Sequence, residues 1–90
     1  MKLGKLQLEL FKYITSDKQI QELEERKARV VKRREAAEEL DSIVVSPELK
    51  EFVVIEWNRL YKEELELELQ IINLKKFQTE FMLERMLADY

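Results

Sequence analysis

The 90-residue chain contains no cysteine and no histidine, and it has only one glycine and one proline. Without cysteine there is no disulfide framework and no thiol chemistry. The two absences together exclude the usual zinc sites, the Cys or Ser–His nucleophile systems and histidine acid–base catalysis. With so few residues for tight turns, an antiparallel sheet protein is not expected. We therefore expect a protein that is not an enzyme and that binds no metal and no cofactor.

Long apolar runs are missing as well. No segment approaches the roughly 20 apolar residues that cross a bilayer, and residues 1–14 lack the uninterrupted apolar core of a signal peptide. The net charge of −3 provides no general attraction to nucleic acid or to a membrane surface. These features predict a cytoplasmic protein without a membrane partner.

Charged and hydrophobic residues are abundant instead. They make up 39% and 46% of the chain, a balance that is typical of long helices or coiled coils and too hydrophobic for a disordered chain. A chain of this length buries a small core and is marginal unless its helices pack well or chains associate. The predicted fold class is all-α, with a single helical domain over residues 1–90.

An apolar residue recurs at every seventh position of the C-terminal half: Val53, Leu60, Leu67, Leu74, Phe81 and Ala88. An α-helix returns to nearly the same face every seven residues. The segment 64–69 alternates Glu and Leu, which is a strand pattern, but Glu and Leu are strong helix formers and Glu is poor in strands. One long helix is therefore predicted. Its wide apolar arc, flanked by Leu65, Leu69 and Ile72, needs more than one partner helix.

Two capping signals divide the chain. Ser46 suits an N-cap, Pro47 the first helical position and Glu48 the positive end of the helix dipole. The β-branched residues 43–45 before them predict an extended connector that tucks into the core. Ser16 followed three residues later by Gln forms a capping box. The predicted helices lie near 3–14, 17–42 and 47–88, as an antiparallel, coiled-coil-like helical hairpin with a short N-terminal third helix.

The apolar residues of the two long helices match in an antiparallel register in which the numbers of opposed residues add up to 90 or 91. The apolar pairs are Ala37–Val53, Val30–Leu60, Leu23–Leu67 and Ile20–Ile71. The remaining pairs are Lys27–Glu64, Arg34–Trp57 and Asp41–Lys50. The match stops beyond Ser16, which supports a break at 15–17 and leaves the helix beyond Ile71 without a hairpin partner.

That unpartnered stretch predicts a partner-binding surface centred on Phe77, Phe81, Met82 and Met86. Methionine and aromatic residues are enriched where helices meet partners. The sequence leaves two alternatives for what covers this surface. One is the apolar face of the predicted helix 3–14 in the same chain; the other is a separate molecule, either a different protein or a second copy of the chain. A homo-oligomer is expected in the second case.

A basic stripe on the second predicted helix is the other candidate site. Arg26, Arg29 and Arg33 share one outward face and form a candidate phosphate-binding site. However, Glu22, Glu25 and Glu38 stand at helical spacing to neutralise Arg26, Arg29 and Arg34. No aromatic residue interleaves for base stacking, so a solvated face is favoured.

The predicted function is that of a small non-catalytic helical module for protein–protein interaction, which self-associates or docks a partner through apolar helix faces. Adaptors, assembly factors, inhibitors and regulators, including those encoded by phages and plasmids, fit this description. The alternative is a nucleic-acid-binding regulator that uses the basic stripe. A small all-helical enzyme is a third alternative, for which no catalytic residue is identified.

Overall fold

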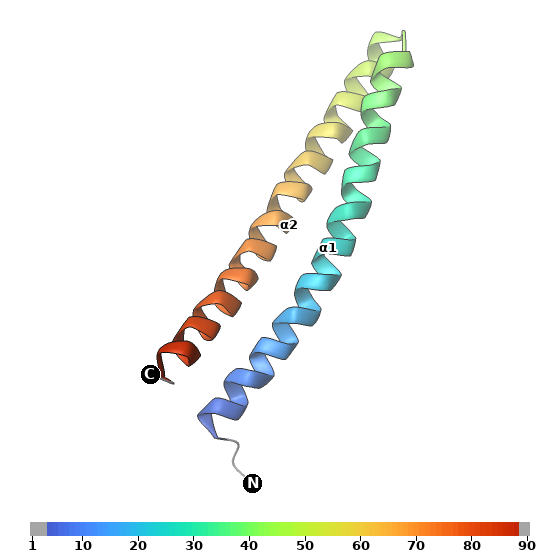
Figure 1. Cartoon of the computed structure of the whole chain (residues 1–90). Coiled ribbons are helices and arrows are strands. Elements are labelled where there is room, and N and C mark those ends of the chain that lie inside the picture. The colour runs from blue at the N-terminus through green and yellow to red at the C-terminus, as the bar shows by residue number, and fades with distance from the viewer. Residues whose placement is uncertain (1–3, 89–90) are drawn as a thin grey trace.

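Two long helices make up the fold in a computed structural model that describes residues 4–88 (Figure 1). Helix α1 spans Lys5–Ile43 and helix α2 spans Pro47–Ala88. They run antiparallel, joined by residues 44–46, and form a hairpin 64 Å long and only 14 Å thick in its thinnest direction. The predictions of an all-α fold and of a helical hairpin are confirmed, and the Glu–Leu alternation at 64–69 is helical.

Helix α2 begins where the capping residues predict. The carbonyl of Ser46 accepts a hydrogen bond from the Lys50 N–H at 3.0 Å, as an N-cap carbonyl does, and Glu48 lies in the first turn. The connector differs from the prediction. Val45 is 89% exposed, because residues 44–46 only bridge the gap between two helix ends and reach no core there.

The predicted break at 15–17 is wrong, and so are the separate helices 3–14 and 17–42. Helix α1 is continuous through these residues. The Ser16 hydroxyl donates to the carbonyl of Tyr13 at 2.7 Å, and the Thr15 hydroxyl donates to the carbonyl of Phe11 at 2.8 Å. Ser and Thr side chains that bond back to the preceding turn leave a helix intact, whereas a cap requires the hydroxyl to accept from a later N–H.

The core is a single seam between the two helices. Its centre is a cluster of Val30, Leu60 and Leu67, against which Leu23 packs. The buried apolar residues are Ile20, Val30, Ala37, Val53, Leu60, Leu67, Ile71 and Phe81. These include four members of the seven-residue row, whereas Leu74 is half-buried and Ala88 is exposed.

The observed register lies about one helical turn from the predicted one. Cross-helix contacts join Ser16 to Gln78 and Tyr13 to Phe81, whose numbers add up to 94 rather than 90 or 91. Opposed apolar residues do not meet head-on, because each side chain fits between residues of the facing helix. Val30 accordingly belongs to one cluster with both Leu60 and Leu67.

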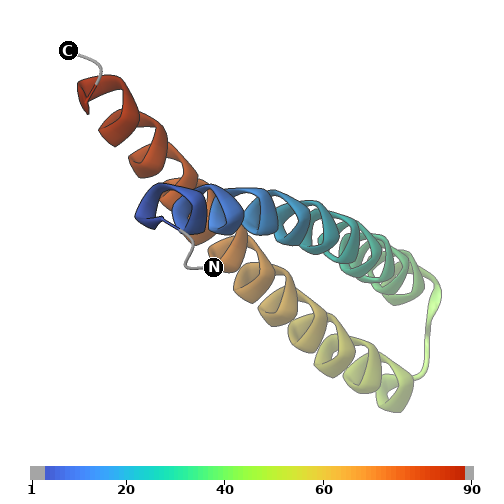
Figure 2. The same ribbon diagram turned by 90° about the horizontal axis from the view of Figure 1, so that it is seen from below.

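Because α1 continues to Lys5, it accompanies α2 well beyond Ile71. The contact of Tyr13 with Phe81 lies in this additional part of the hairpin. The helices cross at an angle, so that the last turns of α2 extend away from the first turns of α1 (Figure 2). These last turns of α2 lie beyond the contact of Tyr13 with Phe81.

Candidate functional site

The four residues of the predicted partner surface are divided by the fold. Phe81 is buried at 7% exposure, and its ring centroid lies 5.3 Å from that of Tyr13. Phe77 is half-buried at the edge of the seam, beside Phe11. Met82 and Met86 remain half-exposed or more, at 49% and 58%. Phe81 therefore belongs to the core of this chain, and the two methionines are the part of the predicted surface that a partner can reach.

A continuous second stripe runs along an exposed side of α2, and one of its members, Ile72, also borders a groove shared with α1. Its positions lie alternately three and four residues apart, which keeps them on one face of a helix. We call this stripe the outer seam; all ten of its members are exposed. Six are apolar, namely Ile55, Leu65, Leu69, Ile72, Leu83 and Met86, and four are polar, namely Asn58, Lys62, Lys76 and Thr79.

The outer seam links observations that the sequence patterns suggested separately. The wide apolar arc at Leu65, Leu69 and Ile72 and the apolar C-terminal end at Met86 are parts of one stripe. The sequence signal for the outer seam is the alternating spacing of three and four residues from Ile55 onward. It is harder to recognise than the row of apolar residues at every seventh position.

The first turns of α1 form a further apolar area. Of the residues there, Tyr13 is covered by α2, whereas Leu6, Leu8, Leu10, Phe11 and Ile14 are exposed. Cover by this face is one of the two alternatives left open by the sequence. Tyr13 provides it against Phe81, and Phe11 borders Phe77. Leu3 lies outside the described residues.

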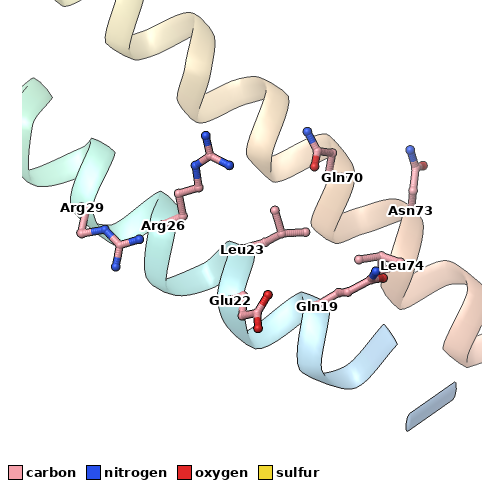
Figure 3. Close-up of a pocket in the computed structure, with 8 residues that line it drawn as sticks. All are labelled: Gln19, Glu22, Leu23, Arg26, Arg29, Gln70, Asn73 and Leu74. Carbon is pink, nitrogen blue, oxygen red and sulfur yellow. The ribbon is translucent and has the colours of Figure 1, made fainter. Parts of the chain in front are cut away.

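The basic stripe of α1 borders a shallow groove on one side of the hairpin (Figure 3). Leu23 and Leu74 lie between the two helices there, and Arg26 and Arg29 stand at the rim on α1. The third predicted residue, Arg33, is exposed but does not line the groove. Gln70 and Asn73 complete the rim from α2.

The predicted neutralisation of the stripe occurs at one position of three. Arg34 forms an ion pair with Glu38 at 2.7 Å. Within residues 4–88, no carboxylate lies within 4.0 Å of the guanidinium groups of Arg26, Arg29 or Arg33. None of these three groups forms an ion pair with a described residue, but Glu22 lines the same groove as Arg26 and Arg29, and the charge of Arg33 contributes to lowering the pKa of Glu56.

Charged residues occupy part of the seam and replace the predicted pairs. Lys27 lies 3.9 Å from Glu68 rather than beside Glu64. Glu64 instead pairs with Arg34, whose Nε lies 3.2 Å from the carboxylate. Burial works against the charge of Arg34, but its hydrogen bonds to Glu64 and Glu38 and the charges of these carboxylates raise its pKa on balance.

Trp57 makes different contacts from those predicted. It stacks on Tyr61, with ring centroids 5.1 Å apart and planes 11° from parallel, and its indole N–H donates to Glu38 at 3.0 Å. The Glu38 carboxylate thus binds both Trp57 and Arg34, in place of the predicted direct pairing of these two residues. The predicted pair of Asp41 and Lys50 is not among the ion pairs of the described residues.

Arg59 and the half-buried Glu56 form a local ion pair on α2. The hydrogen bonds that Arg59 donates hold the pKa of Glu56 below its ordinary value of 4.5. A lowered folded-state pKa means that the pair supports folding above pH 4.5. This support is lost as the pH falls through the lowered pKa.

A double-mutant cycle tests the observed pairing. We expect Arg34→Met alone to lower the melting temperature more than Arg34→Met with Glu64→Leu, because the single substitution leaves Glu64 unpaired in the seam, whereas Glu64→Leu leaves Arg34 its pair with Glu38. Lys27→Met and Glu64→Leu should show no coupling, since Lys27 pairs with Glu68. Thermal unfolding followed by circular dichroism measures both cycles. Coupling of Glu64 to Lys27 but not to Arg34 would restore the register predicted from the sequence.

Neither described helix is long and apolar enough to span a membrane. No group of three or more acidic side chains within residues 4–88 is placed to hold a metal ion.

Comparisons of the chain with protein-family models, with curated proteins and with solved structures found no match.

Proposed function

We propose that this chain is a small non-catalytic helical module for protein–protein interaction, which acts by self-association or by docking a partner on the exposed apolar faces of its helices. We propose the cytoplasm as its setting, because a chain without cysteine has no need of an oxidising compartment. Adaptor, assembly factor, inhibitor and regulator are the roles that such a module fulfils.

The observation that carries the proposal is the large surface of the hairpin. The accessible surface is 7651 Å², whereas a compact monomer of 10.9 kDa exposes about 5,600 Å². The radius of gyration is 20.0 Å, compared with about 12 Å for a compact domain of this length. One chain thus exposes about 2,000 Å² more than a compact fold does, and large apolar side chains contribute to it. Extended apolar surface of this kind marks an interaction site.

A capture experiment tests the proposal. Immobilised chain is exposed to native lysate with and without nuclease, at low salt and at 1 M salt, and the retained proteins are identified by mass spectrometry. Self-association is measured in parallel by light scattering. We expect association that resists both nuclease and salt and that weakens in the double variant Met82→Lys, Met86→Lys. A chain that remains monomeric and retains nothing under these conditions contradicts the proposal.

Nucleic-acid binding is the second candidate, and the unpaired state of Arg26, Arg29 and Arg33 favours it. Three phosphate contacts predict that affinity for duplex DNA falls about 40-fold between 50 and 200 mM salt. Fluorescence anisotropy with labelled DNA and RNA measures this dependence. Replacing the three arginines with glutamine should abolish binding, whereas Lys18→Gln on the same helix should not. Affinity that is insensitive to salt would exclude this candidate.

A further inference from the structure

We propose that the outer seam of α2 is the contact between two copies of this chain, packed antiparallel with Leu69 of each copy against Ile72 of the other. The inference deepens the proposed function by naming the occupant of the apolar face, and it rests on that function. The dimer would place the two α2 helices in the centre and one α1 helix on each flank.

The geometry of α2 allows both contacts at once. We call the row of α2 core residues Val53, Leu60, Leu67 and Ile71, which packs against α1, the inner seam. The outer seam lies roughly 150° around the helix from it, since each residue turns the helix by about 100°. Leu69 and Ile72 are 58% and 53% exposed on this side. A second helix docked there would therefore not compete with α1, and the prediction of more than one partner helix would be fulfilled.

The spacing of the outer seam selects a small number of registers. In an antiparallel pair of identical helices, the two-fold axis relates each seam residue to one partner position. An axis between Gln70 and Ile71 brings Leu69 and Ile72 together twice at the centre. The same axis brings Ile55 opposite Met86 of the second copy near each end. Lys76, opposite Leu65, contributes its aliphatic stem.

The residues beside the seam fit this register by charge. The same axis places Glu68 opposite Lys75 of the second copy. It places Arg59, which also pairs with Glu56 and Glu63 of its own chain, opposite Glu80 of the second copy. Two further flanking pairs are apolar, Tyr61 with Met82 and Phe52 with Leu87. Opposite charges beside an apolar seam are the device by which coiled coils fix partner and orientation.

A shift by one heptad in either direction removes this complementarity. One shift places Glu68 on Glu68 of the second copy and likewise Glu66 on Glu66. The other places Lys75 on Lys75 and Glu66 on Glu80. Each shift also separates Leu69 from Ile72. Because like charges oppose both shifted registers, the charge pattern specifies one antiparallel arrangement.

The hairpin exposes enough surface to form such a contact. Stable interfaces bury about 800 Å² on each partner, and the hairpin exposes about 2,000 Å² beyond a compact fold. Within the chain, Lys75 already lies 3.1 Å from Glu24, and Glu68 lies 3.9 Å from Lys27. The proposed contact joins these pairs into a network of alternating charges across the dimer.

Charge reversal provides the first test. Arg59→Glu and Glu80→Arg each place like charges at two symmetric contacts, so each should weaken the homodimer about tenfold. Mixing the two variants restores both attractive contacts, and sedimentation of the mixture should show a heterodimer of wild-type affinity. Glu25→Arg, an equal charge change on the exposed side of α1, should leave the dimer unchanged. Homodimers that tolerate both reversals would overturn the register.

Cysteine cross-linking tests the orientation, since the chain has no native cysteine. A mixture of Leu65→Cys chains and Lys76→Cys chains should form a disulfide-linked dimer under mild oxidation. Leu65→Cys chains alone should not, because antiparallel packing holds their two thiols several helical turns apart. Cross-linking of Leu65→Cys alone would demonstrate parallel packing and overturn the proposal.

A third variant separates the proposal from the function on which it rests. Leu69→Glu should convert the dimer into a helical monomer, with its dissociation constant raised about 100-fold or more. A wild-type chain that is monomeric but captures a discrete protein, and loses it in Leu69→Glu, refutes the second copy and retains the interaction function. A wild-type chain that neither dimerises nor captures a protein refutes both.

Discussion

Phe81→Ala is expected to lower the free energy of unfolding by about 3 kcal/mol or more, the effect of removing a buried aromatic side chain. The ring of Phe81 is almost fully covered and lies against Tyr13, on the part of α1 that sequence patterns assign to a separate helix. Its removal opens a cavity where the two helices begin to diverge. Urea unfolding followed by circular dichroism measures the loss.

Leu8→Ala is the matched control, at the same end of the hairpin but on a side chain exposed to solvent. It should change the unfolding free energy by no more than about 0.5 kcal/mol. If Phe81→Ala instead left stability intact and abolished association, Phe81 would be a partner contact, as predicted from the sequence.

The parts of the fold that local chemistry determines could be predicted from the sequence. The start of α2 follows from Ser46 and Pro47, whose preferences act within a single turn. The inner seam follows from a seven-residue period that only a helix can satisfy, and Val53, Leu60 and Leu67 are buried as predicted. Both inferences depend on residues that are close together along one helix.

The parts that depend on contacts between the helices could not be predicted in this way. Ser16 suits a cap and also suits back-bonding within a continuous helix. Its surroundings favour the second, because the Gln78 amide donates to the Ser16 hydroxyl at 3.1 Å from the facing helix. The register is similarly undetermined by the sequence, because the seven-residue period does not reveal that charged pairs such as Arg34–Glu64 enter the seam.

The wrong prediction of a helix break at 15–17 also makes part of the predicted partner surface wrong. A break there removes the partner of Phe81, so Phe81 is predicted to be available when it is core. Met82 and Met86 are exposed even though α1 is continuous. The exposure of residues outside the seam between the helices can therefore be predicted from the sequence. The exposure of a seam residue such as Phe81 cannot, because it depends on how far α1 extends.

Asp17→Pro distinguishes the continuous helix from the broken one and is expected to destabilise the hairpin by about 3 kcal/mol or more. In a continuous helix, proline removes the N–H at position 17 and its ring meets the carbonyl of Tyr13. If Ser16 were instead an N-cap, position 17 would be the first helical residue, where proline is favoured. The two structures thus predict opposite results from one substitution.

Urea unfolding and the helix signal at 222 nm measure the effect of Asp17→Pro. Asp17→Ala is the control, because it removes the same side chain at an exposed position and leaves the backbone N–H in place. Alanine is the better helix former, so this variant should match or slightly exceed the parent in stability. A proline variant as stable as the alanine variant would mean that α1 is interrupted at Ser16 and would free the surface around Phe81. A loss of stability confined to the proline variant establishes that α1 accompanies α2 as far as Tyr13. Phe81 is then a core residue, and the exposed outer seam is the surface left for a partner.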